Sequence, residues 1–594
     1  MMKMSGSRAL LMIGVAASAL AAAPAFAADA AKATATTAPA ADPTPATDPT
    51  PAAEPDQLQD IVVTATKRET NLQKTPIAIS VLDPEAIKDR HVQSLLDLGD
   101  GAVPSLRVAT FEARQSALTI GIRGIVPFDQ NQTARDSGVG VYIDGVYLGR
   151  SQGLNAALFD VQRIEVLRGP QGTLFGRNTE GGALSIVTKA PTGEFGGRVT
   201  AGFGNYGARN GEAHIDLPEY QNISIKLDGV YQHQDATTRN PLAGQLGWNA
   251  YDRVGGRIAA RWKPTDSFTA DVAFDKARDE NTPFFSQLIN YNPLGRTVGV
   301  LDRTTNRIVL PGSAAGAPTC LSSTISATTC IAPLPALVGV HPNRQSVADV
   351  GVPQQYSVDK TQGVSATLSY KVDPAITLKS ITAWRRVATN QWDNSGGPER
   401  VAYAPNGKFS RYSLSDLYQS QFSQEFQAIG SVDQLDWVAG LYYFNEQARE
   451  SAATPSSNQW NADGTAYTIL PSQVFGTISS SNQGWDYNSR FLQRASVART
   501  RSYAAYGQAT WTPAAAEMLH LTVGGRYSKD KRDGTLYLVS GVPTNYVLNY
   551  DRGRFDPMVT LAADAAPGIN LYAKYSSGFR AAVSYTHLTL PTKA

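Results

Sequence analysis

The chain has 594 residues, of which 18% are charged, and its formal net charge is +2. It contains 51 Gly and 25 Tyr but only 6 Met and 2 Cys, a composition typical of an all-β protein with many turns. A net charge this small, without a basic run to follow a phosphate backbone, argues against a nucleic acid partner.

Residues 1–27 have the layout of an export signal. Lys3 and Arg8 give a positive segment that precedes an apolar run, Ala9–Ala23. Ala25-Phe26-Ala27 then fits a small-x-small cleavage site. The alternative is a membrane anchor, but the run is short and rich in Ala rather than Leu. No later stretch reaches the roughly twenty apolar residues that a membrane helix needs. We therefore expect an exported protein, either soluble outside the cell or inserted in a membrane as a barrel.

A low-complexity segment of Ala, Pro, Thr and Asp at residues 28–59 predicts an extended tether. A short β-type run, DIVVTATKRE, follows at residues 60–69. We interpret this run as a lone strand at the end of the tether, outside any domain. The alternative is that the run is the first strand of the domain that follows.

Residues 70–192 predict one compact α/β domain. The segment SVLDPEAIKDR, with Asp83 ahead of Pro84, predicts a capped helix after a strand. VGVYIDGVYLGR predicts two strands about an Asp144-Gly145 turn. VQRIEVLRGPQGTLFGRNTEGGALSIVTKAP predicts a strand, a Gly-rich turn region and a second strand.

The Gly-rich part of that last segment does not fit a phosphate-binding loop. Its glycines lack the required spacing, and no Lys followed by Ser or Thr comes after them. We expect Gly169, Gly172 and Gly176 to serve turns.

From residue 193 to residue 582 the sequence alternates between apolar and polar residues in strands of about ten residues. In RVGGRIAARWK one face carries Val254, Ile258, Ala260 and Trp262, and the other carries Arg253, Arg257, Arg261 and Lys263. A soluble sandwich with one wet face is the alternative explanation of such alternation. Short turns that alternate with long loops, Asp279–Gln354 and about Gln447–Thr500, favour an outer-membrane barrel. We count about fourteen strand candidates.

Aromatic residues support the barrel because several fall at or near strand ends, where an interfacial girdle lies. They are Trp262, Trp437, Trp511 and Tyr575. Cys320 and Cys330 enclose a polar segment, and exported thiols usually pair, so we expect a local disulfide. A metal site is the less favoured alternative because no His or further Cys lies close by.

These segments, taken together, resemble one family. DIVVTATKRE resembles the TonB box of TonB-dependent outer-membrane receptors, and ALTIGIRGI, VGVYIDGVYLGR and the Gly-rich segment resemble their plug domain. The resemblance implies an α/β plug inside the lumen of an all-β transmembrane barrel with 22 strands when complete. It also implies that the box pairs with TonB, which with its inner-membrane motor proteins supplies energy from the proton gradient. The TonB-binding residues would be Ile61, Val62, Val63, Thr64 and Ala65.

Two plug arginines have a role implied by the resemblance. Arg123, in an IRG element, and Arg168, in an RGP element, occupy positions that pair with barrel-wall carboxylates in the family. We expect Glu425, in SQEFQ, to be a barrel partner in this lock. The alternative is that the two arginines only satisfy local carbonyl groups.

The expected cargo is a ferric siderophore, the commonest class in the family, with vitamin B12, haem and oligosaccharides as other classes. The candidate ligand-binding loop residues are Trp392, Tyr403, Trp460 and Trp485. The alternative is that these rings only order the loops. Two further readings are a passive porin and a surface-binding barrel.

An enzyme is not expected. The chain has 6 His, and it has no Gly-x-Ser-x-Gly, no His-Glu-x-x-His and no Cys cluster, so we expect no catalytic residue, metal or cofactor. The end of the chain departs from the family, because YAKYSSGFRA resembles a strand well before the family's last one. Residues 583–594 contain VSYTHLTLPT, which resembles a translated sequencing adaptor. We therefore expect a C-terminally truncated receptor of the Gram-negative outer membrane.

Overall fold

The computed structural model describes residues 61–581 except 112–113, 127–132, 134, 156–157, 294, 315–319, 321–329, 395–402, 471–492 and 567–568. All described residues belong to one compact unit, Asp60–Ala594. The predicted export signal, the tether and residues 583–594 lie outside the described part. None of the described helices is both long enough and apolar enough to cross a bilayer.

The N-terminal part of this unit is a small α/β domain. Its elements are β1 (Val62–Val63), β2 (Thr70–Asn71), η1 (Leu72–Lys74), β3 (Ile79–Leu82), α1 (Pro84–Asp89), η2 (Leu95–Asp100), β4 (Leu106–Phe111), β5 (Arg114–Ile122), β6 (Val139–Ile143), β7 (Val146–Leu148), β8 (Val161–Arg168) and β9 (Gly182–Thr188). The central sheet has the order β3-β8-β9-β6-β7. An apolar core that includes Leu98, Leu118 and Ile164 packs between this sheet, η2 and the β4-β5 ribbon.

Local sequence signals explain two features of this domain. The Asp83 carboxylate accepts a hydrogen bond from the Ala86 backbone N–H at 2.8 Å and caps α1, as predicted. β6 and β7 form the predicted hairpin, with Asp144 at φ 48° and Gly145 at φ 81°. Positive φ at both central residues is the mark of a tight hairpin turn.

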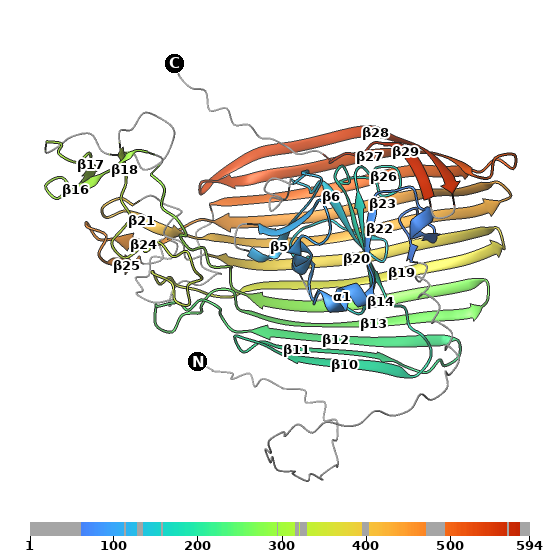
Figure 1. The fold of residues 1–594 in the computed structure, drawn as a ribbon, viewed down its shortest axis with the longest axis horizontal. Coiled ribbons are helices and arrows are strands. Elements are labelled where there is room, and N and C mark those ends of the chain that lie inside the picture. Colours follow the sequence, from blue (N-terminus) through green and yellow to red (C-terminus); the bar gives the residue numbers. More distant parts are fainter. Residues whose placement is uncertain are drawn as a thin grey trace, which may run out of the picture. The chain divides into compact units, whose positions relative to one another are not determined.

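The rest of the unit is dominated by one antiparallel sheet of thirteen described strands, each paired with the next along the chain. The strands are β10 (Gly196–Phe203), β11 (Arg209–Asp216), β12 (Ile223–Gln234), β13 (Tyr251–Thr265), β14 (Phe268–Asn281), β19 (Ser357–Asp373), β20 (Ile376–Asp393), β22 (Ser413–Val432), β23 (Leu435–Ala453), β26 (Arg494–Trp511), β27 (Leu519–Val539), β28 (Val542–Ala566) and β29 (Ile569–Ser576). Figure 1 shows these long strands curving beside elements α1, β5 and β6 of the small domain.

The alternation predicted from the sequence is present. Along β13, Val254 and Ile258 are 51% and 53% exposed, whereas Arg253 and Arg257 are 6% and 8% exposed. The apolar face therefore points away from the small domain and the polar face points toward it, as in a barrel rather than a sandwich. The strands are longer than the ten residues expected, reaching 25 residues in β28, and thirteen are described where about fourteen were counted.

The long loops contain short strands that gather beyond one end of the sheet, at the left of Figure 1. They are β15 (Thr297–Val298), β16 (Val300–Asp302), β17 (Arg307–Val309), β18 (Cys330–Ile331), β21 (Lys408–Arg411), β24 (Ser456–Trp460) and β25 (Tyr467–Ile469). The first long loop follows β14, near the predicted position. The second begins only after Ala453 and ends before Arg494, because β23 and β26 run further than predicted.

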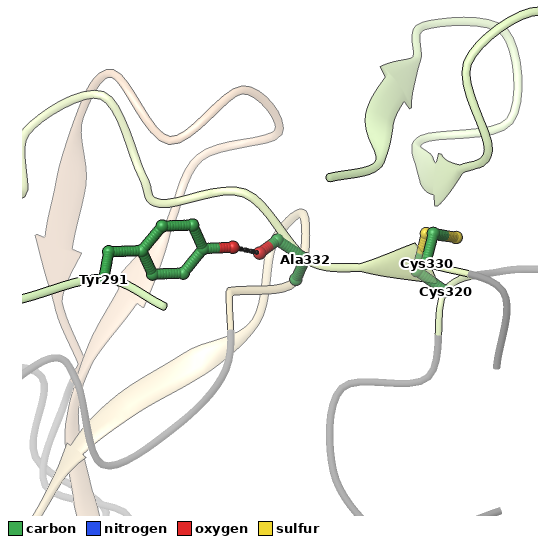
Figure 2. The surroundings of a disulfide bond; sticks show 4 residues. All are labelled: Tyr291, Cys320, Cys330 and Ala332. Carbon is green, nitrogen blue, oxygen red and sulfur yellow. Dashed lines mark hydrogen bonds between the residues drawn. A yellow bond between two sulfur atoms is a disulfide. The ribbon is translucent and has the colours of Figure 1, made fainter. Parts of the chain in front are cut away.

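Cys320 and Cys330 form a disulfide within these loops, with their Cα atoms 5.1 Å apart. Figure 2 shows the bond close to Ala332, whose carbonyl accepts a hydrogen bond from the Tyr291 hydroxyl at 2.6 Å. Both sulfur atoms belong to a buried cluster that we call the loop cluster. It consists of Ile308, Cys320, Cys330, Val338, Val350, Tyr403, Phe409 and Trp460.

Replacing Cys320 and Cys330 together by Ser should loosen the loop cluster. A disulfide that closes a ring of this size stabilises the folded loop by about 2–3 kcal/mol, because it restricts the unfolded loop. Without it, the amide hydrogens of the cluster should exchange faster, while the long strands keep their protection. Hydrogen exchange read by mass spectrometry follows both regions in one sample. Unchanged protection of the cluster would show that the apolar contacts alone hold it.

Candidate functional site

The segment predicted to be a lone exposed strand is part of a hairpin. β1 pairs antiparallel with β2, Val62 opposite Asn71 and Val63 opposite Thr70. Val63 and Ala65 are fully buried. The expectation that this run lies outside any domain is therefore wrong for this structure, and the alternative, that it is the first strand of the domain, holds. Pairing of Ile61–Ala65 with TonB stays a prediction.

A buried carboxylate holds the same segment from the other side. The Glu165 side chain in β8 accepts hydrogen bonds from the Thr64 backbone N–H at 2.9 Å and from the Thr64 hydroxyl at 3.1 Å. Arg163 donates to the same oxygen at 2.7 Å. Since Glu165 is fully buried, these partners of Oε1 offset part of the cost of burying the carboxylate, whose Oε2 has no hydrogen bond from the described residues.

Two cations that follow the hairpin strand reach the wall of the long sheet. Lys67 Nζ lies 3.3 Å from Glu425 Oε1 in β22, and both side chains are nearly buried. Arg68 Nη2 lies 2.7 Å from Asp436 Oδ1 in β23. Glu425 also accepts a hydrogen bond from the Tyr506 hydroxyl at 2.5 Å. We call the pairs Lys67–Glu425 and Arg68–Asp436 the inner latch, because they join the hairpin to the wall near the short-turn end of the strands.

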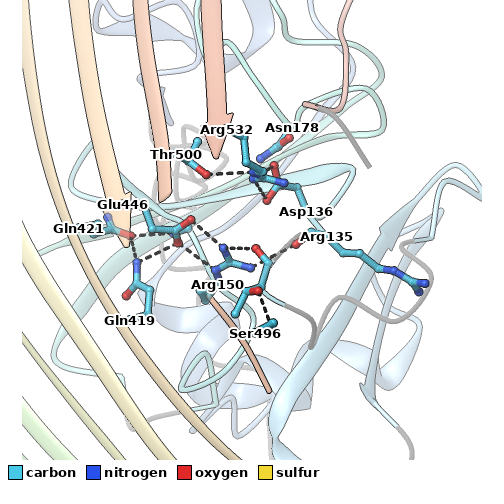
Figure 3. Close-up of polar contacts among 12 residues, drawn as sticks. Arg135, Asp136, Arg150, Asn178, Gln419, Gln421, Glu446, Ser496, Thr500 and Arg532 are labelled. Carbon is cyan, nitrogen blue, oxygen red and sulfur yellow. Dashed lines mark hydrogen bonds and ion pairs between the residues drawn. The ribbon is translucent and has the colours of Figure 1, made fainter. Parts of the chain in front are cut away.

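Nearer the long-loop end, a second group of buried charges joins the small domain to the wall (Figure 3). The Asp136 carboxylate accepts hydrogen bonds from Arg532 Nη2 of β27 at 2.7 Å and from Arg177 Nη2 at 2.5 Å. Arg150 donates to both oxygens of Glu446 in β23, at 2.9 and 2.8 Å. We call these five residues the outer lock. Side-chain amides extend it, since Gln421 of β22 contacts the Tyr147 carbonyl and the Gly149 N–H.

The electrostatics of the outer lock favour the ionised carboxylate. Burial alone would raise the pKa of Asp136, but the charges of Arg532, Arg177 and Arg150 outweigh burial and hold that pKa well below its ordinary value. In the same way the pKa of Arg177 is raised by Asp136 and Asp530 in spite of burial. Both groups therefore stay charged throughout the physiological pH range.

The predicted lock of Arg123 and Arg168 with Glu425 is not what the structure contains. Glu425 takes its ion pair from Lys67. Arg168 donates to the Ile79 carbonyl at 3.4 Å, within the small domain. The Arg123 guanidinium lies so close to Gly169 that a Cβ added there would be 2.6 Å from Nη1. Arg168 thus meets a local carbonyl group, the alternative weighed above, and Arg123 lies beside Gly169 within the small domain.

The glycines of the Gly-rich segment do more than form turns. Gly169 and Gly176 have positive φ, 89° and 84°. A Cβ on Gly172 would lie 2.6 Å from the Ser577 carbonyl oxygen, and one on Gly176 would lie 2.7 Å from the Arg526 guanidinium. The segment therefore needs glycine where the wall of the sheet approaches it closely.

The described aromatic ligand candidates are buried against their neighbours. Trp392, Tyr403 and Trp460 are 1%, 6% and 3% exposed. Trp460 stacks on Phe409 with ring centroids 3.9 Å apart. The structure favours the alternative that these rings order the loops. Trp485 lies outside the described residues.

One group in the described part has the spacing of a metal site: Asp160, His214 and Asp228 offer ligand atoms within 4.8 Å of one another. Side-chain cations already neutralise Asp160, because Lys226 Nζ bonds to it, Arg198 Nη2 lies 3.0 Å away and Lys189 Nζ lies 3.2 Å away. Burial would raise the pKa of Asp160, but the hydrogen bond and charge of Lys226 lower it to about 2. The arrangement fits an anchor between the small domain and the wall better than a metal centre.

Sequence reasoning missed the residues of the outer lock. Glu446 and Arg532 lie on the polar face of their strands, which alternation identifies. Their partners Asp136, Arg150 and Arg177 lie in irregular segments that carry no periodic signal. Which inward charge meets which residue of the small domain depends on how two distant parts of the chain dock.

Two family models match the chain. One, described as the TonB-dependent receptor plug domain, matches residues 71–183. The other, described as a TonB dependent receptor-like β-barrel, matches residues 323–591. The first covers the small α/β domain apart from β1, the start of β2 and the end of β9, and we call the whole domain the plug from here on. The second covers much of the long sheet, which we call the barrel wall.

Sequence relatives include receptors, one of them named as an outer membrane protein. The pesticin receptor of Yersinia pestis is 25% identical over 247 residues, which are 41% of this chain and 35% of that protein. The ferrichrome outer membrane transporter/phage receptor of Escherichia coli is 28% identical over 207 residues, which are 34% of this chain and 26% of that protein. The matched regions therefore span about a third of the first relative and about a quarter of the second.

Solved structures show the same fold. The ferric yersiniabactin uptake receptor of Yersinia pestis has a TM-score of 0.58 at 18% identity, covering 84% of this chain and 64% of that one. The ferric-catecholate import receptor of Escherichia coli has a TM-score of 0.60 at 14% identity, covering 87% of this chain and 71% of that one. Sequence identities this low show that the fold is shared and do not show which ligand is bound.

Replacing Asp136 by Asn should loosen the plug, because Arg532 and Arg177 then keep buried charges without a full counter-charge. Removal of one partner from a buried ion pair costs about 3–5 kcal/mol. Hydrogen exchange of plug amides in detergent or lipid measures the effect. The matched control is Asp100→Asn, which breaks an exposed pair with Arg90 and should change nothing measurable.

The pH dependence of the same interaction has a definite sign. The pKa of Asp136 is lowered in the folded state. The stabilisation of the folded plug by Asp136 is therefore complete above the ordinary Asp pKa of about 4, and it is lost only as the pH falls further. Plug protection in the wild type should therefore persist as the pH falls to about 4, whereas loss of that protection between pH 7 and pH 5 would contradict this account.

Proposed function

The chain belongs to the family of TonB-dependent receptors, and from this membership we propose that it takes up a scarce ligand across the outer membrane of a Gram-negative bacterium. The observation that carries the proposal is the inner latch. The segment that would bind TonB is held in the plug and is tied to the barrel wall by Lys67–Glu425 and Arg68–Asp436. A passive porin needs neither a plug nor such a latched segment.

The location rests on the two faces of the barrel wall. Apolar side chains such as Ile258, Phe426 and Leu441 are more than half exposed on the outer face, which suits contact with lipid. Buried charges occupy the inner face, where the plug supplies their partners. The export signal predicted at residues 1–27 and the receptors named above agree with the outer membrane.

Energy must come from another membrane, because the outer membrane holds neither ATP nor an ion gradient. TonB would supply it by adding the Ile61–Ala65 segment to one of its sheet edges. In the structure the backbone of this segment pairs with β2 and donates a hydrogen bond to the Glu165 carboxylate. Pairing with TonB therefore requires the hairpin to open, and the inner latch links that opening to the barrel wall.

We propose a ferric siderophore as the ligand. The sequence relatives that carry a ligand in their names include the ferrichrome transporter of Escherichia coli and a probable siderophore receptor of Acinetobacter baumannii, which is 30% identical over 186 residues. A vitamin B12 transporter of Vibrio vulnificus is 27% identical over 219 residues, so vitamin B12 is the first alternative to test. The motor proteins that act with TonB and the lipid of the outer membrane are the other expected partners.

Uptake tests the proposed function directly. The full chain is expressed in a Gram-negative host that lacks its own siderophore receptors, and radioactive iron is supplied as hydroxamate, catecholate or mixed siderophores. We expect uptake of at least one chelate, and none in the same host without TonB. Uptake that continues without TonB would instead indicate a porin, and uptake of vitamin B12 alone would change the ligand.

Replacing Val62 by Pro should abolish pairing with TonB, because Pro removes a backbone N–H and cannot continue a ladder. We expect no capture of the purified periplasmic domain of TonB by the variant. The control is Val62→Thr, which keeps the N–H and the β-branched shape and should bind like the wild type. Equal capture by the Pro variant would place the TonB-binding segment elsewhere.

Replacing Glu425 by Gln should have the opposite effect. The neutral amide leaves Lys67 without its counter-ion, so the hairpin opens more often and the open fraction rises. Apparent affinity for TonB scales with that fraction, and we expect a gain of about three- to tenfold. Calorimetric titration measures it, with the exposed Asp433→Asn at the nearby turn as the matched control. An affinity that does not rise would show that Glu425 does not restrain the segment.

A further inference from the structure

Two cavities lie between the plug and the part of the barrel wall formed by β13, β14, β19 and β20. The inner cavity encloses about 1340 Å³, including solvent at its mouth, and the outer cavity about 820 Å³. Their positions follow from the strand they share: Ser365 and Thr367 of β19 line the inner cavity, and Thr361 lines the outer one. The cavities are therefore stacked along the strands, the inner one nearer the short turns.

The sequence explains why space remains on this side. The inward side chains of β14 and β19 are small at Ala273, Ala277, Ser365 and Thr367. On the wall beyond β20 the inward side chains of β22 are long, and Gln421 and Glu425 reach the plug directly. The plug is thus fastened closely to β22 and stands away from β14 and β19.

One ion pair separates the two cavities. Thr188 and Arg257 line both of them. Arg257 Nη2 of β13 lies 3.0 Å from Asp144 Oδ2, at the tip of the β6-β7 hairpin. Asp144 is fixed there, because it also accepts hydrogen bonds from the backbone N–H and the hydroxyl of Thr188, both at 2.9 Å. Arg257 is therefore the partner that can swing away from the partition.

The outer cavity holds a second pair of the same kind. Arg385 of β20 donates to both oxygens of Asp275 in β14, each at 2.8 Å. Both arginines thus project from the wall and hold carboxylates. A bidentate guanidinium suits any planar pair of anionic oxygens, so an anionic chelate can replace a carboxylate as partner without leaving the guanidinium unpaired.

We propose that the two cavities form the route by which an anionic, oxygen-rich chelate passes the plug, and that Asp144–Arg257 is the gate between them. Arg385 would receive the chelate in the outer cavity, and Arg257 would pass it to the inner one as the gate opens. The proposal rests on the proposed uptake function for its cargo, but the gate itself is a property of the chain alone.

Thiol labelling tests the gate without cargo or TonB. Both native cysteines are in the disulfide, so a single introduced cysteine is the reactive thiol. Thr361→Cys reports on the outer cavity, and Thr522→Cys, which lines a cavity beside β27, reports on general loosening of the plug. The purified full chain is treated with a small sulfonated thiol reagent, with and without Arg257→Gln.

We expect Arg257→Gln to speed labelling at Thr361→Cys by about tenfold. This factor corresponds to a change of about 1.4 kcal/mol in the free energy of gate opening. Labelling at Thr522→Cys should stay within twofold, and Arg257→Lys should resemble the wild type. If neither site changes, the pair is not a gate. If both sites speed up equally, the pair holds the whole plug and the gate is likewise refuted.

A reversible crosslink tests the route. Val146 of the plug packs against Ala383 of β20, so Val146→Cys with Ala383→Cys ties the plug to the wall beside the cavities. Thr133→Cys with Ser496→Cys ties it to β26, away from the cavities, where the two hydroxyls lie 2.9 Å apart. We expect oxidation of the first pair alone to stop uptake, with recovery on reduction.

Uptake that continues with the first pair oxidised would refute the route, and so would an equal block by both pairs. If the wild-type chain takes up no chelate at all, the proposed function fails. The labelling result then decides the gate by itself.

Discussion

The structure depends on one constraint, the separation of two faces along every strand of the barrel wall. A strand that faces lipid on one side must pair all its backbone groups with neighbouring strands and show apolar side chains outward. The strict period of two then places every other residue inward. Arg253, Arg257, Arg526 and Arg532 are inward and nearly buried, so each needs partners inside the lumen.

The plug supplies partners for several inward charges of the wall, and this determines how it is held. Asp136 and Arg150 meet charges of β27 and β23, Asp160 meets Lys226 of β12, and Lys67 meets Glu425 of β22. Buried ion pairs add less net stability than an apolar interface of similar size, because desolvation offsets much of the attraction. A plug held by charges can therefore be specific in its position and still be released by a modest force, which an apolar plug could not.

Local chemistry made part of this predictable from the sequence. Asp83 caps its helix, and Asp144 and Gly145 occupy a turn, because each feature depends on a few adjacent residues. The alternation of β13 was readable for the same reason. Glu425 was identified as a barrel carboxylate that meets the plug, but its partner is Lys67 rather than Arg123 or Arg168, since pairing across some 358 residues depends on docking. The burial of Trp392 and Trp460 could not be predicted from the sequence either, because a loop sequence does not show whether its aromatic rings face solvent or one another.

The central proposal is that the Ile61–Ala65 segment, held in the plug at rest, is released to TonB. The most direct measurement follows hydrogen exchange at these residues in the full chain in lipid while the periplasmic domain of TonB is titrated in. The account predicts slow exchange at rest, and saturable binding of TonB that is lost when an excess peptide of sequence DIVVTATKRE competes. Fast exchange at rest together with no binding of TonB would contradict it.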